Sequence, residues 1–407
     1  MAYDIAFLGG IFPKELEHYI QVNSKGNIQN AANELQKKFI QGLDLNNGKP
    51  IKIFNSLYIG SFPFRFKKIR IPTFEFHHSE SNVSNDINIG FCNLLVIKHF
   101  SRYNTVKKNI EKWCEKDTGE KKILIAYAMT TPFMKILKFA KKKNKSIITI
   151  LIVPDLPQYM NTSNKQSFVY LILKKIDNIQ IRKCMSSVDK YILLTKHMAN
   201  YLNIEKNDFT VIEGIGNVVD DNYESRIKDN KKVILYTGTL NKRYGILTLL
   251  SSLKYLDDDD IRLYICGEGD AKKEILDLAK IDKRIVYLGQ IPHEDVIKLQ
   301  KEASLLINPR SNNESFVKYS FPSKILEYIS SGTPTLVYKL DGIPEEYNQV
   351  LYYIEGNSPL DMANSIKKCL YFNDEERKNI WEKSLNFINE GKTPYKQVRK
   401  IFDLINH

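Results

Sequence analysis

The sequence predicts an α/β protein made of two doubly wound domains, each a parallel sheet covered by helices on both faces. Short, continuously apolar runs alternate with amphipathic stretches along the whole chain, and this alternation is typical of βαβ units. The 407 residues exceed what one hydrophobic core usually supports, which indicates about two domains. The alternation restarts at Lys232 after a polar, charged stretch.

The individual elements follow from the same two patterns. The strands are continuous apolar runs because parallel strands are buried on both faces; they are expected at 4–8, 51–55, 122–127, 146–153, 190–194, 210–212, 232–237, 262–266, 284–288, 304–307 and 335–337. Helices are expected where apolar residues recur with a helical period, at 28–43, 133–143, 247–256, 272–279, 293–303 and 324–331.

The domain boundary is expected at the polar stretch 219–231. We assign residues 1–218 to a first domain and residues 219–390 to a second. The final segment, 391–407, begins at Gly391 and carries a helix over 395–404 that is expected to cross back to the first domain.

The composition indicates a globular protein without a membrane span. Hydrophobic residues make up 43% of the chain and charged residues 26%. No apolar run reaches the roughly 18 residues that a span needs. The N-terminus lacks a basic segment and fits a first strand, so we expect a cytoplasmic protein. The five cysteines are scattered, which argues against a disulfide framework or a zinc site.

The chain is basic, with a net charge of +13. Nucleic acid, an anionic membrane surface or anionic substrates could each account for this charge. The cations cluster at 64–70, 135–145 and 174–183, all in the first half. Each cluster alone fits a solvated face, but their bias toward one half favours a first domain that faces an anionic membrane. No nucleic-acid-binding motif accompanies the charge, so a nucleic-acid partner is not expected.

The most informative stretch is 314–337, where a polar loop, an amphipathic helix and a short strand follow one another. Ser323 is expected as the N-cap and Lys324 in the first turn. A lysine at the positive end of a helix makes sense where an anion binds, since the free N–H groups already favour phosphate. Glu327, one turn later, could accept hydrogen bonds from sugar hydroxyls. The alternative is a surface helix with an ordinary cap.

The run FPSKILEYISSGTP at 321–334 resembles the donor-binding helix of family 4 glycosyltransferases, which have the GT-B fold of two Rossmann-like domains facing each other across a cleft. The resemblance is strong over 233–346 and weaker elsewhere. It implies that Ser323, Lys324 and Ile325 bind the donor phosphates and that Glu327 binds the ribose. Glu327 matches the second Glu of the family's E-x7-E pattern. The first falls at Tyr319, and Glu314 could replace it only across a short insertion.

The loop after the strand 232–237 also resembles the family. Gly238 lies at the strand end, and Lys242 and Arg243 would supply cations to the donor phosphates. In the family an Arg follows the first glycine and a Lys precedes the second, whereas this chain has Thr239 and Tyr244 there. Lys242 and Arg243 would therefore act from shifted positions, and solvated loop cations are the alternative.

Three further strand-end loops carry glycines or prolines. Gly10 follows the first strand, and in the family this loop lies near the donor phosphate and the acceptor; a plain tight turn is the alternative. Gly289 and Ile291 lie in a loop that resembles the one holding the nucleobase through backbone groups. Asp155 lies in the proline-fixed loop after the strand 146–153, where it would bind an acceptor hydroxyl or stabilise positive charge on the sugar, or form an Asx-turn.

Three weaker candidates for contact with an acceptor lie between Lys25 and Gln29, and a lone histidine follows a later strand. Lys25, Asn27 and Gln29 open or precede the first long helix and could contact an acceptor. His197 follows another strand, although a lone histidine is more often structural.

The resemblance implies a retaining glycosyltransferase that moves a sugar from a nucleoside diphosphate donor, expected to be a UDP-sugar, to a hydroxyl of a glycan or lipid-linked oligosaccharide. Asp155, Lys324 and Arg243 are the expected catalytic residues. No metal or other cofactor is expected, and surface polysaccharide synthesis, such as capsule or O-antigen, is the expected setting at the inner membrane face. Two alternatives stay open: a GT-B sugar-nucleotide epimerase or hydrolase without an acceptor, and a non-enzymatic basic nucleic-acid-binding protein.

Overall fold

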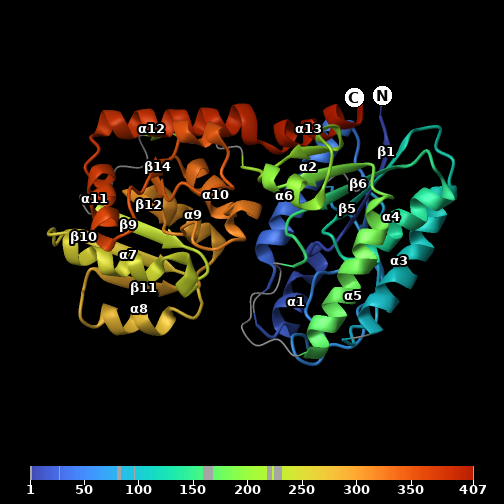
Figure 1. Ribbon diagram of the computed structural model, residues 1–407, viewed down its shortest axis with the longest axis horizontal. Coiled ribbons are helices and arrows are strands. Elements are labelled where there is room, and N and C mark those ends of the chain that lie inside the picture. Colours follow the sequence, from blue (N-terminus) through green and yellow to red (C-terminus); the bar gives the residue numbers. More distant parts are fainter. Residues whose placement is uncertain are drawn as a thin grey trace. The chain divides into compact units, whose positions relative to one another are not determined.

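The computed structural model describes residues 2–26, 28–79, 84–95, 97–158, 168–217, 222–223 and 232–406. Asn27, the expected domain junction between 218 and 219, and most of the stretch 219–231 lie outside the described residues. The chain forms two compact units (Figure 1): unit 1 comprises Met1–Ile215 and Pro394–His407, and unit 2 comprises Gly216–Thr393. These junctions differ by a few residues from those that we placed by sequence.

Unit 1 contains an eight-stranded sheet with the order β3-β4-β2-β1-β5-β6-β7-β8. Its strands are β1 Asp4–Gly9, β2 Lys52–Asn55, β3 Phe74–Phe76, β4 Asp86–Asn88, β5 Lys122–Tyr127, β6 Ile148–Val153, β7 Lys190–Leu193 and β8 Phe209–Val211. All neighbours are parallel except β3, which pairs antiparallel with β4. The sequence did not indicate β3 and β4, because each has only three residues and includes an acid.

The helices of unit 1 are α1 Glu17–Asn23, α2 Asn30–Asn47, α3 Ile97–Glu115, α4 Thr131–Lys143, α5 Phe168–Met185, α6 Lys196–Leu202 and α13 Pro394–Asn406. The last helix, α13, packs against α2, far away in sequence (Figure 1). Gly42 of α2 permits this close approach, because a Cβ there would lie 2.4 Å from the carbonyl oxygen of Pro394. Val398, Ile401 and Phe402 of α13 are buried in the core of this unit.

Unit 2 contains a six-stranded, fully parallel sheet with the order β11-β10-β9-β12-β13-β14. Its strands are β9 Lys232–Thr237, β10 Ile261–Cys266, β11 Ile285–Gly289, β12 Leu305–Asn308, β13 Thr335–Val337 and β14 Tyr352–Tyr353, and its helices are α7 Ile246–Ser252, α8 Lys272–Ala279, α9 His293–Glu302, α10 Ser323–Ser331, α11 Pro359–Leu370 and α12 Asp374–Phe387. The predicted fold class, two doubly wound domains with parallel sheets, is confirmed.

Two further observations concern the cysteines and the helices. All five cysteines are free, and four of them are buried. Within the described residues, none of the helices combines the length and the apolarity that a membrane span requires.

His78, whose side chain is 10% exposed, joins the C-terminal part of α2 to β4 near the edge of the sheet of unit 1. His78 Nδ1 lies 2.6 Å from Asp86 Oδ2, and His78 Nε2 lies 3.0 Å from Asp44 Oδ2. Asp86 also accepts a hydrogen bond from the Ile53 amide at 2.8 Å. Burial lowers the pKa of His78, but its hydrogen bonds to Asp44 and Asp86 and their charges outweigh burial and raise the pKa from 6.5 to about 9. His78 is therefore held as an imidazolium at neutral pH.

We expect unit 1 to become less stable as the pH rises into the alkaline range, because this imidazolium loses its proton. Because the pKa of His78 is higher in the folded protein, its contribution is complete below about 6.5 and is lost as the pH rises through about 9. At about 1.4 kcal/mol for each pH unit, the loss is roughly 3 kcal/mol of unfolding free energy. Denaturant unfolding between pH 6 and 10 measures it. A His78→Gln variant should lose most of this dependence, while His18→Gln, an exposed control on α1, should keep it.

Candidate functional site

The strand order of unit 2 reverses between β9 and β12. From β9 the chain proceeds outward to β10 and β11, and it then returns to build β12, β13 and β14 on the other side. Ligands of open α/β sheets bind at such a reversal, beyond the carboxyl ends of the strands. In unit 2 this point lies between Thr237, which ends β9, and Asn308, which ends β12.

Backbone contacts join the loops beyond β9, β10 and β11. Gly238, Gly267 and Gly289 all have positive φ values, of 155°, 138° and 69°. The Gly238 amide donates to the carbonyl of Cys266 at 3.0 Å, and the Gly267 amide donates to that of Gly289 at 2.8 Å. Ile291, farther along the β11 loop, packs against the core beneath these loops. The three glycine loops thus form one rigid edge beside the strand reversal.

Helix α10 begins one residue earlier than the sequence suggested. Pro322, not Ser323, occupies the N-cap, and Ser323 is the first helical residue without a side-chain capping bond. The expectation of a Ser323 cap is therefore wrong, because Pro322 already has the extended backbone of a cap and its missing N–H costs the helix nothing. The Ile325 amide donates to Pro322 at 2.9 Å, and the Ile325 side chain is fully buried.

The carboxylate of Glu327 is held by two side chains. Lys324 Nζ lies 2.9 and 3.0 Å from its two oxygens, and Gln300 Nε2 donates to Oε1 at 2.6 Å. Burial raises the pKa of Glu327, but the charge of Lys324 and the hydrogen bonds from Lys324 and Gln300 outweigh it and lower the pKa below its usual value. Glu327 is thus kept as a carboxylate, with its side chain 24% exposed.

Gln300 connects this carboxylate to the strand reversal. Its Nε2 also donates to Thr237 Oγ1 at 3.2 Å, and its backbone carbonyl accepts from Thr333 Oγ1 at 2.7 Å. On the other side, Tyr328 Oη accepts from the Thr237 amide at 2.9 Å. Helices α9 and α10 are therefore fixed against the end of β9. The sequence gives no sign of Gln300, because an amide inside an amphipathic helix has no distinctive local pattern.

The two cations of the β9 loop are paired with acids. Lys242 Nζ forms an ion pair with Glu274 of α8, and the Lys242 amide donates to Asp270 at 2.9 Å. Arg243 Nε lies 4.0 Å from Glu314 Oε1, a contact between the loops on the two sides of the reversal. The structure thus directs Lys242 toward α8 and Arg243 toward the β12 loop, and both are exposed.

A third cation of this unit, Arg310, escaped the sequence reasoning. It follows the carboxyl end of β12, where its guanidinium lies 5.0 Å from the Tyr244 ring and 5.2 Å from the Phe316 ring and donates to Ser320 at 3.0 Å. Its position two residues after a buried strand was the available signal.

The two candidates in the other unit lie at strand ends of the first sheet. The Gly10 amide donates to Gln36 Oε1 at 2.8 Å, and a Cβ at this position would lie 2.5 Å from the Tyr58 ring. This tight packing means that the Gly10 amide already has its acceptor inside the protein. Asp155 is exposed at the bend after β6, within electrostatic range of Tyr127. Gly10 and Asp155 therefore belong to unit 1, whereas the candidate donor-site residues described above belong to unit 2.

Two of the weaker acceptor candidates, Lys25 and Gln29, and the lone histidine His197 are also located. Lys25 donates to the Pro63 carbonyl at 2.9 Å, Gln29 precedes α2, and His197 lies in the first turn of α6.

No metal centre is present in the part of the chain that the structure describes: no three His, Cys, Asp or Glu side chains are placed to share an ion. The acidic run 257–260 is a loop in which Asp258 pairs with Lys232.

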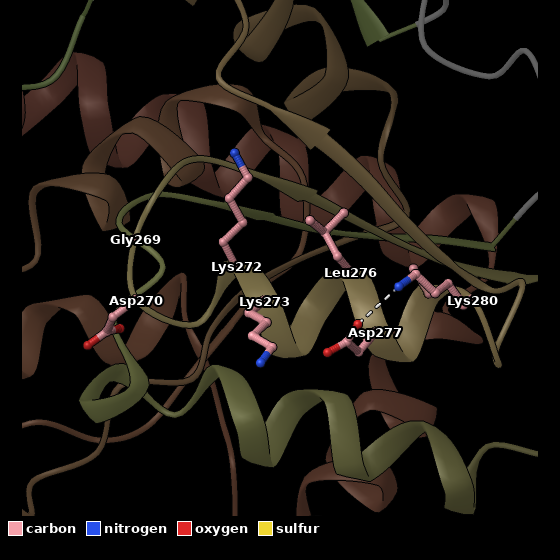
Figure 2. Close-up of a pocket in the computed structure, with 8 residues that line it drawn as sticks. Gly269, Asp270, Lys272, Lys273, Leu276, Asp277 and Lys280 are labelled. Carbon is pink, nitrogen blue, oxygen red and sulfur yellow. Dashed lines mark hydrogen bonds and ion pairs between the residues drawn. The ribbon is translucent and has the colours of Figure 1, made fainter.

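A shallow depression of about 740 Å³ lies along α8 and the loop that precedes it. Figure 2 shows that Lys272 and Lys273 point to opposite sides of the helix and that Lys280 turns to Asp277. Lys272 is also paired with Glu268 at 2.8 Å. Because these cations do not converge, we assign no ligand to the depression.

Comparison with known sequence families finds a match for unit 2. Residues 220–387 match the family model of glycosyl transferases group 1. No curated protein matches the chain in sequence.

Several solved structures resemble the whole chain. Sucrose-phosphate synthase from Thermosynechococcus elongatus superposes with a TM-score of 0.64 at 14% identity, covering 99% of this chain and 98% of that one. HepE of Anabaena in complex with UDP gives 0.61 at 11% identity, with both chains covered fully at 100%. The lipopolysaccharide outer core galactosyltransferase WaaB gives 0.61 at 12% identity, covering 99% of each chain. These likenesses show the GT-B fold, as expected. The family match over residues 220–387 supports a transferase enzyme.

Proposed function

We propose that this chain is a retaining glycosyltransferase that moves a sugar from a nucleoside diphosphate sugar to an acceptor hydroxyl, with Glu327 and Lys324 at the donor site. The observation that carries the proposal is the ion pair of these residues on the first turns of α10, braced by Gln300 at the strand reversal. It lies inside the segment that matches glycosyl transferases group 1. A UDP-sugar is the first candidate donor, since the similar HepE structure contains UDP.

When the donor binds, Lys324 and Glu327 would separate and each would contact a part of the donor instead. The diphosphate is an anion, so it would attract Lys324 and the free N–H groups at the start of α10. Glu327, still held by Gln300, would then accept hydrogen bonds from the ribose hydroxyls. In this way one carboxylate and one ammonium, which satisfy each other in the free protein, become the two halves of a nucleotide site.

The difficult step is the departure of the nucleoside diphosphate from the sugar. Donors aimed at the oxygens where negative charge develops lower this barrier. Lys324 and the α10 N-terminus would supply these donors. Arg243 and Arg310 lie in the loops that follow β9 and β12, the two strands that flank the reversal. A donor phosphate oxygen can accept the proton of the attacking hydroxyl, so no metal or strong protein base is required in this scheme. Asp155 of unit 1 would orient the acceptor.

The acceptor is proposed to be a glycan or a lipid-linked oligosaccharide used for surface polysaccharide such as capsule or O-antigen, reached by peripheral association with the inner membrane face. The charge of the chain supports an acceptor of this kind, because lipid-linked glycans are carried on diphosphates in an anionic leaflet. The similar galactosyltransferase WaaB is described as acting on the lipopolysaccharide outer core.

Thermal unfolding with a nucleotide panel tests the donor assignment. UDP, GDP, ADP and their sugars would be added at millimolar concentration to the full chain. A ligand at 100 times its Kd stabilises by about 2.7 kcal/mol, which raises the midpoint by several degrees. We expect UDP and one or more UDP-sugars to produce this rise. If no nucleotide moves the midpoint, the proposed donor site is wrong.

A second measurement distinguishes transfer from hydrolysis. Release of UDP from the sugar that binds would be followed with and without glycan and lipid-linked acceptors. Acceleration by an acceptor supports transfer, whereas turnover that no acceptor changes would indicate an epimerase or hydrolase.

A further inference from the structure

Two cations of unit 1, Lys98 and Arg102, are buried next to each other; we call them the α3 cation pair. They lie four residues apart on one face of α3, and each is only 8% exposed. Lys98 donates to the carbonyl of Ile59. Arg102 donates to Ser56 Oγ at 3.0 Å and to the carbonyls of Ser56 and Leu57. The pair is therefore fixed to the loop that follows β2.

The charge of the pair is not balanced by an acid in the part of the chain that the structure describes. Neither cation forms an ion pair there, and the nearby segments 56–73 and 91–103 contain no Asp or Glu. Burial and the charge of Arg102 lower the pKa of Lys98 to about 7, and burial lowers that of Arg102 to about 10. Because removing a charge from water is costly and carbonyl partners recover only part of that cost, the pair favours an added anion.

Aromatic rings hold the guanidinium of Arg102 in place. It lies 4.7 Å from the Phe91 ring, 5.6 Å from the Tyr58 ring and 5.9 Å from the Phe133 ring. Lys98 Nζ lies 5.9 Å from the same Phe91 ring. Ring faces attract a cation without neutralising it. The positive charge is therefore fixed at one point of the fold.

This point lies where the strand order of unit 1 reverses. From β1 the chain builds β2, β3 and β4 on one side of the sheet, and it then returns to add β5 to β8 on the other. Tyr58 spans the reversal, because its amide donates to Gly10 after β1 at 3.3 Å and its hydroxyl donates to the carbonyl of Tyr127 at the end of β5. Ligands of open α/β sheets bind at such a reversal. The pair is bonded to the loop that contains Tyr58, so it lies at the ligand-binding edge of unit 1.

Helix α4 adds positive charge at the same place. It packs against α3 (Figure 1), and Phe133 of its first turn lies against Arg102. Within the described residues this first turn contains no acid, and its N-cap, Thr130, makes no side-chain capping bond. The free N–H groups at the start of α4 therefore remain positive, and they would favour the same anion.

One acid lies at the margin of this positive region. Burial lowers the pKa of His99, the charge of Asp177 of α5 opposes this, and the charges of the pair and of Lys135 of α4 add to it. Asp177 accepts a hydrogen bond from Thr131 Oγ1, and it is not among the groups that shift the pKa of Lys98 or Arg102. Asp177 therefore does not neutralise the pair.

We propose that the α3 cation pair binds an anionic group, a carboxylate or a phosphate, that is carried by the acceptor. Lys98 uses one N–H on Ile59, and Arg102 Nη1 makes no hydrogen bond within the described residues, so donors remain for the anion. The acceptor would then be an acidic glycan, with a uronic acid or a phosphorylated sugar next to the hydroxyl that is glycosylated. Calling the ligand an acceptor rests on the proposed function, whereas the anion site rests on the pair alone.

Thermal unfolding of the full chain with small ligands tests the anion site. Glucuronate, inorganic phosphate and glucose, the neutral counterpart of glucuronate, would be compared at equal ionic strength. We expect an anion to raise the midpoint and glucose to leave it unchanged. A rise with glucuronate alone assigns a uronic acid, and a rise with phosphate alone assigns a phosphorylated sugar. If neither anion moves the midpoint, or if glucose moves it as much, the proposal is wrong.

Lys98→Met removes the charge and keeps the length of the side chain. It should weaken binding of the effective anion at least about tenfold, because a hydrogen bond to a charged group is lost. It also removes a buried cation from beside Arg102, so the midpoint of the free protein should stay the same or rise. A lysine that only supports the loop would behave in the opposite way. A lower midpoint with unchanged anion binding would therefore overturn the proposal.

Lys122→Met is the matched control. Lys122 is also 8% exposed, and it donates to the carbonyls of Trp113 and Cys114, at the other end of α3, at 2.5 and 3.2 Å. This variant should lower the midpoint and keep the response to the anion. Equal loss of the response in both variants would indicate a disturbed α3 rather than an anion site.

The pH dependence of glucuronate binding gives a second readout. Glucuronate stays ionised above pH 6, whereas Lys98 loses its proton as the pH rises through about 7. The affinity should therefore fall above this pH, by up to about tenfold for each pH unit, and Lys98→Met should lose this dependence. The pKa of His99 is lowered from 6.5, so this group titrates below the range. An affinity that does not change between pH 6 and 9 would contradict a role for Lys98.

UDP distinguishes this site from the donor site. Stabilisation by UDP should be the same in Lys98→Met as in the wild type. If Lys98→Met abolishes it, the pair binds the donor diphosphate and its assignment to the acceptor is wrong. If the anions stabilise the protein and no nucleotide does, the proposed donor site fails while the anion site is supported.

Discussion

Replacing Glu327 by Ala should weaken UDP binding by about 10- to 100-fold, because hydrogen bonds to a charged group contribute about 1.5–3 kcal/mol. The carboxylate is held ready for the ribose by Gln300 at 2.6 Å, while Lys324 neutralises it in the free protein. Its lowered pKa keeps it ionised across the neutral range. Glu327→Gln, which keeps the shape and loses the charge, should give an intermediate loss.

Comparing UDP with inorganic pyrophosphate separates the two halves of the site. Removing Glu327 releases Lys324 from its ion pair, so pyrophosphate, which has no ribose, should bind the variant at least as well as the wild type. Calorimetric titration of both ligands measures this difference. Glu302→Ala is the control, since Glu302 is an exposed carboxylate at the last residue of α9. Equal losses for both ligands would contradict a ribose role for Glu327 and indicate a disturbed helix.

Helix α10 could be located from the sequence because its signals are local. The proline, the lysine of the first turn and the terminating Gly332 lie within one short segment, and the structure has a helix there over Ser323–Ser331. The cap was misplaced by one residue because a serine and a proline are both common where helices begin. Whether Glu327 binds a donor stays a prediction.

The partners of the candidate side chains could not be predicted, because they come from distant segments. Gln300 lies 27 positions before Glu327 and reaches it only after α9 and α10 pack on the same sheet edge. Lys242 looks like a free loop cation in the sequence, yet it pairs with Glu274 of α8, 32 positions away. β3 and β4 were missed for the related reason that pairing partners, not apolar runs, define such short strands.

Replacing Gly267 by Ala should destabilise unit 2 by about 3 kcal/mol or more and abolish nucleotide binding. A Cβ at this position would lie 1.9 Å from the carbonyl oxygen of Gly238, and φ is 138° there. The obstructing atom is backbone, so no rotamer change can relieve the overlap. The loops after β9 and β10 would have to separate at the strand reversal where the donor is proposed to bind. Thermal unfolding should show a midpoint roughly 6–12 °C lower.

Alanine substitutions at two other glycines distinguish the cost of steric overlap from the cost of backbone strain. Gly48 has a φ of 71° but open space around its Cβ position, so Gly48→Ala should cost only the strain, about 1–2 kcal/mol. Gly391 has open space and no positive φ, so Gly391→Ala should leave the midpoint nearly unchanged. A Gly267→Ala protein as stable as the Gly391→Ala protein, with UDP binding intact, would show that the two loops can move apart freely. The rigid glycine edge would then not be what positions the donor.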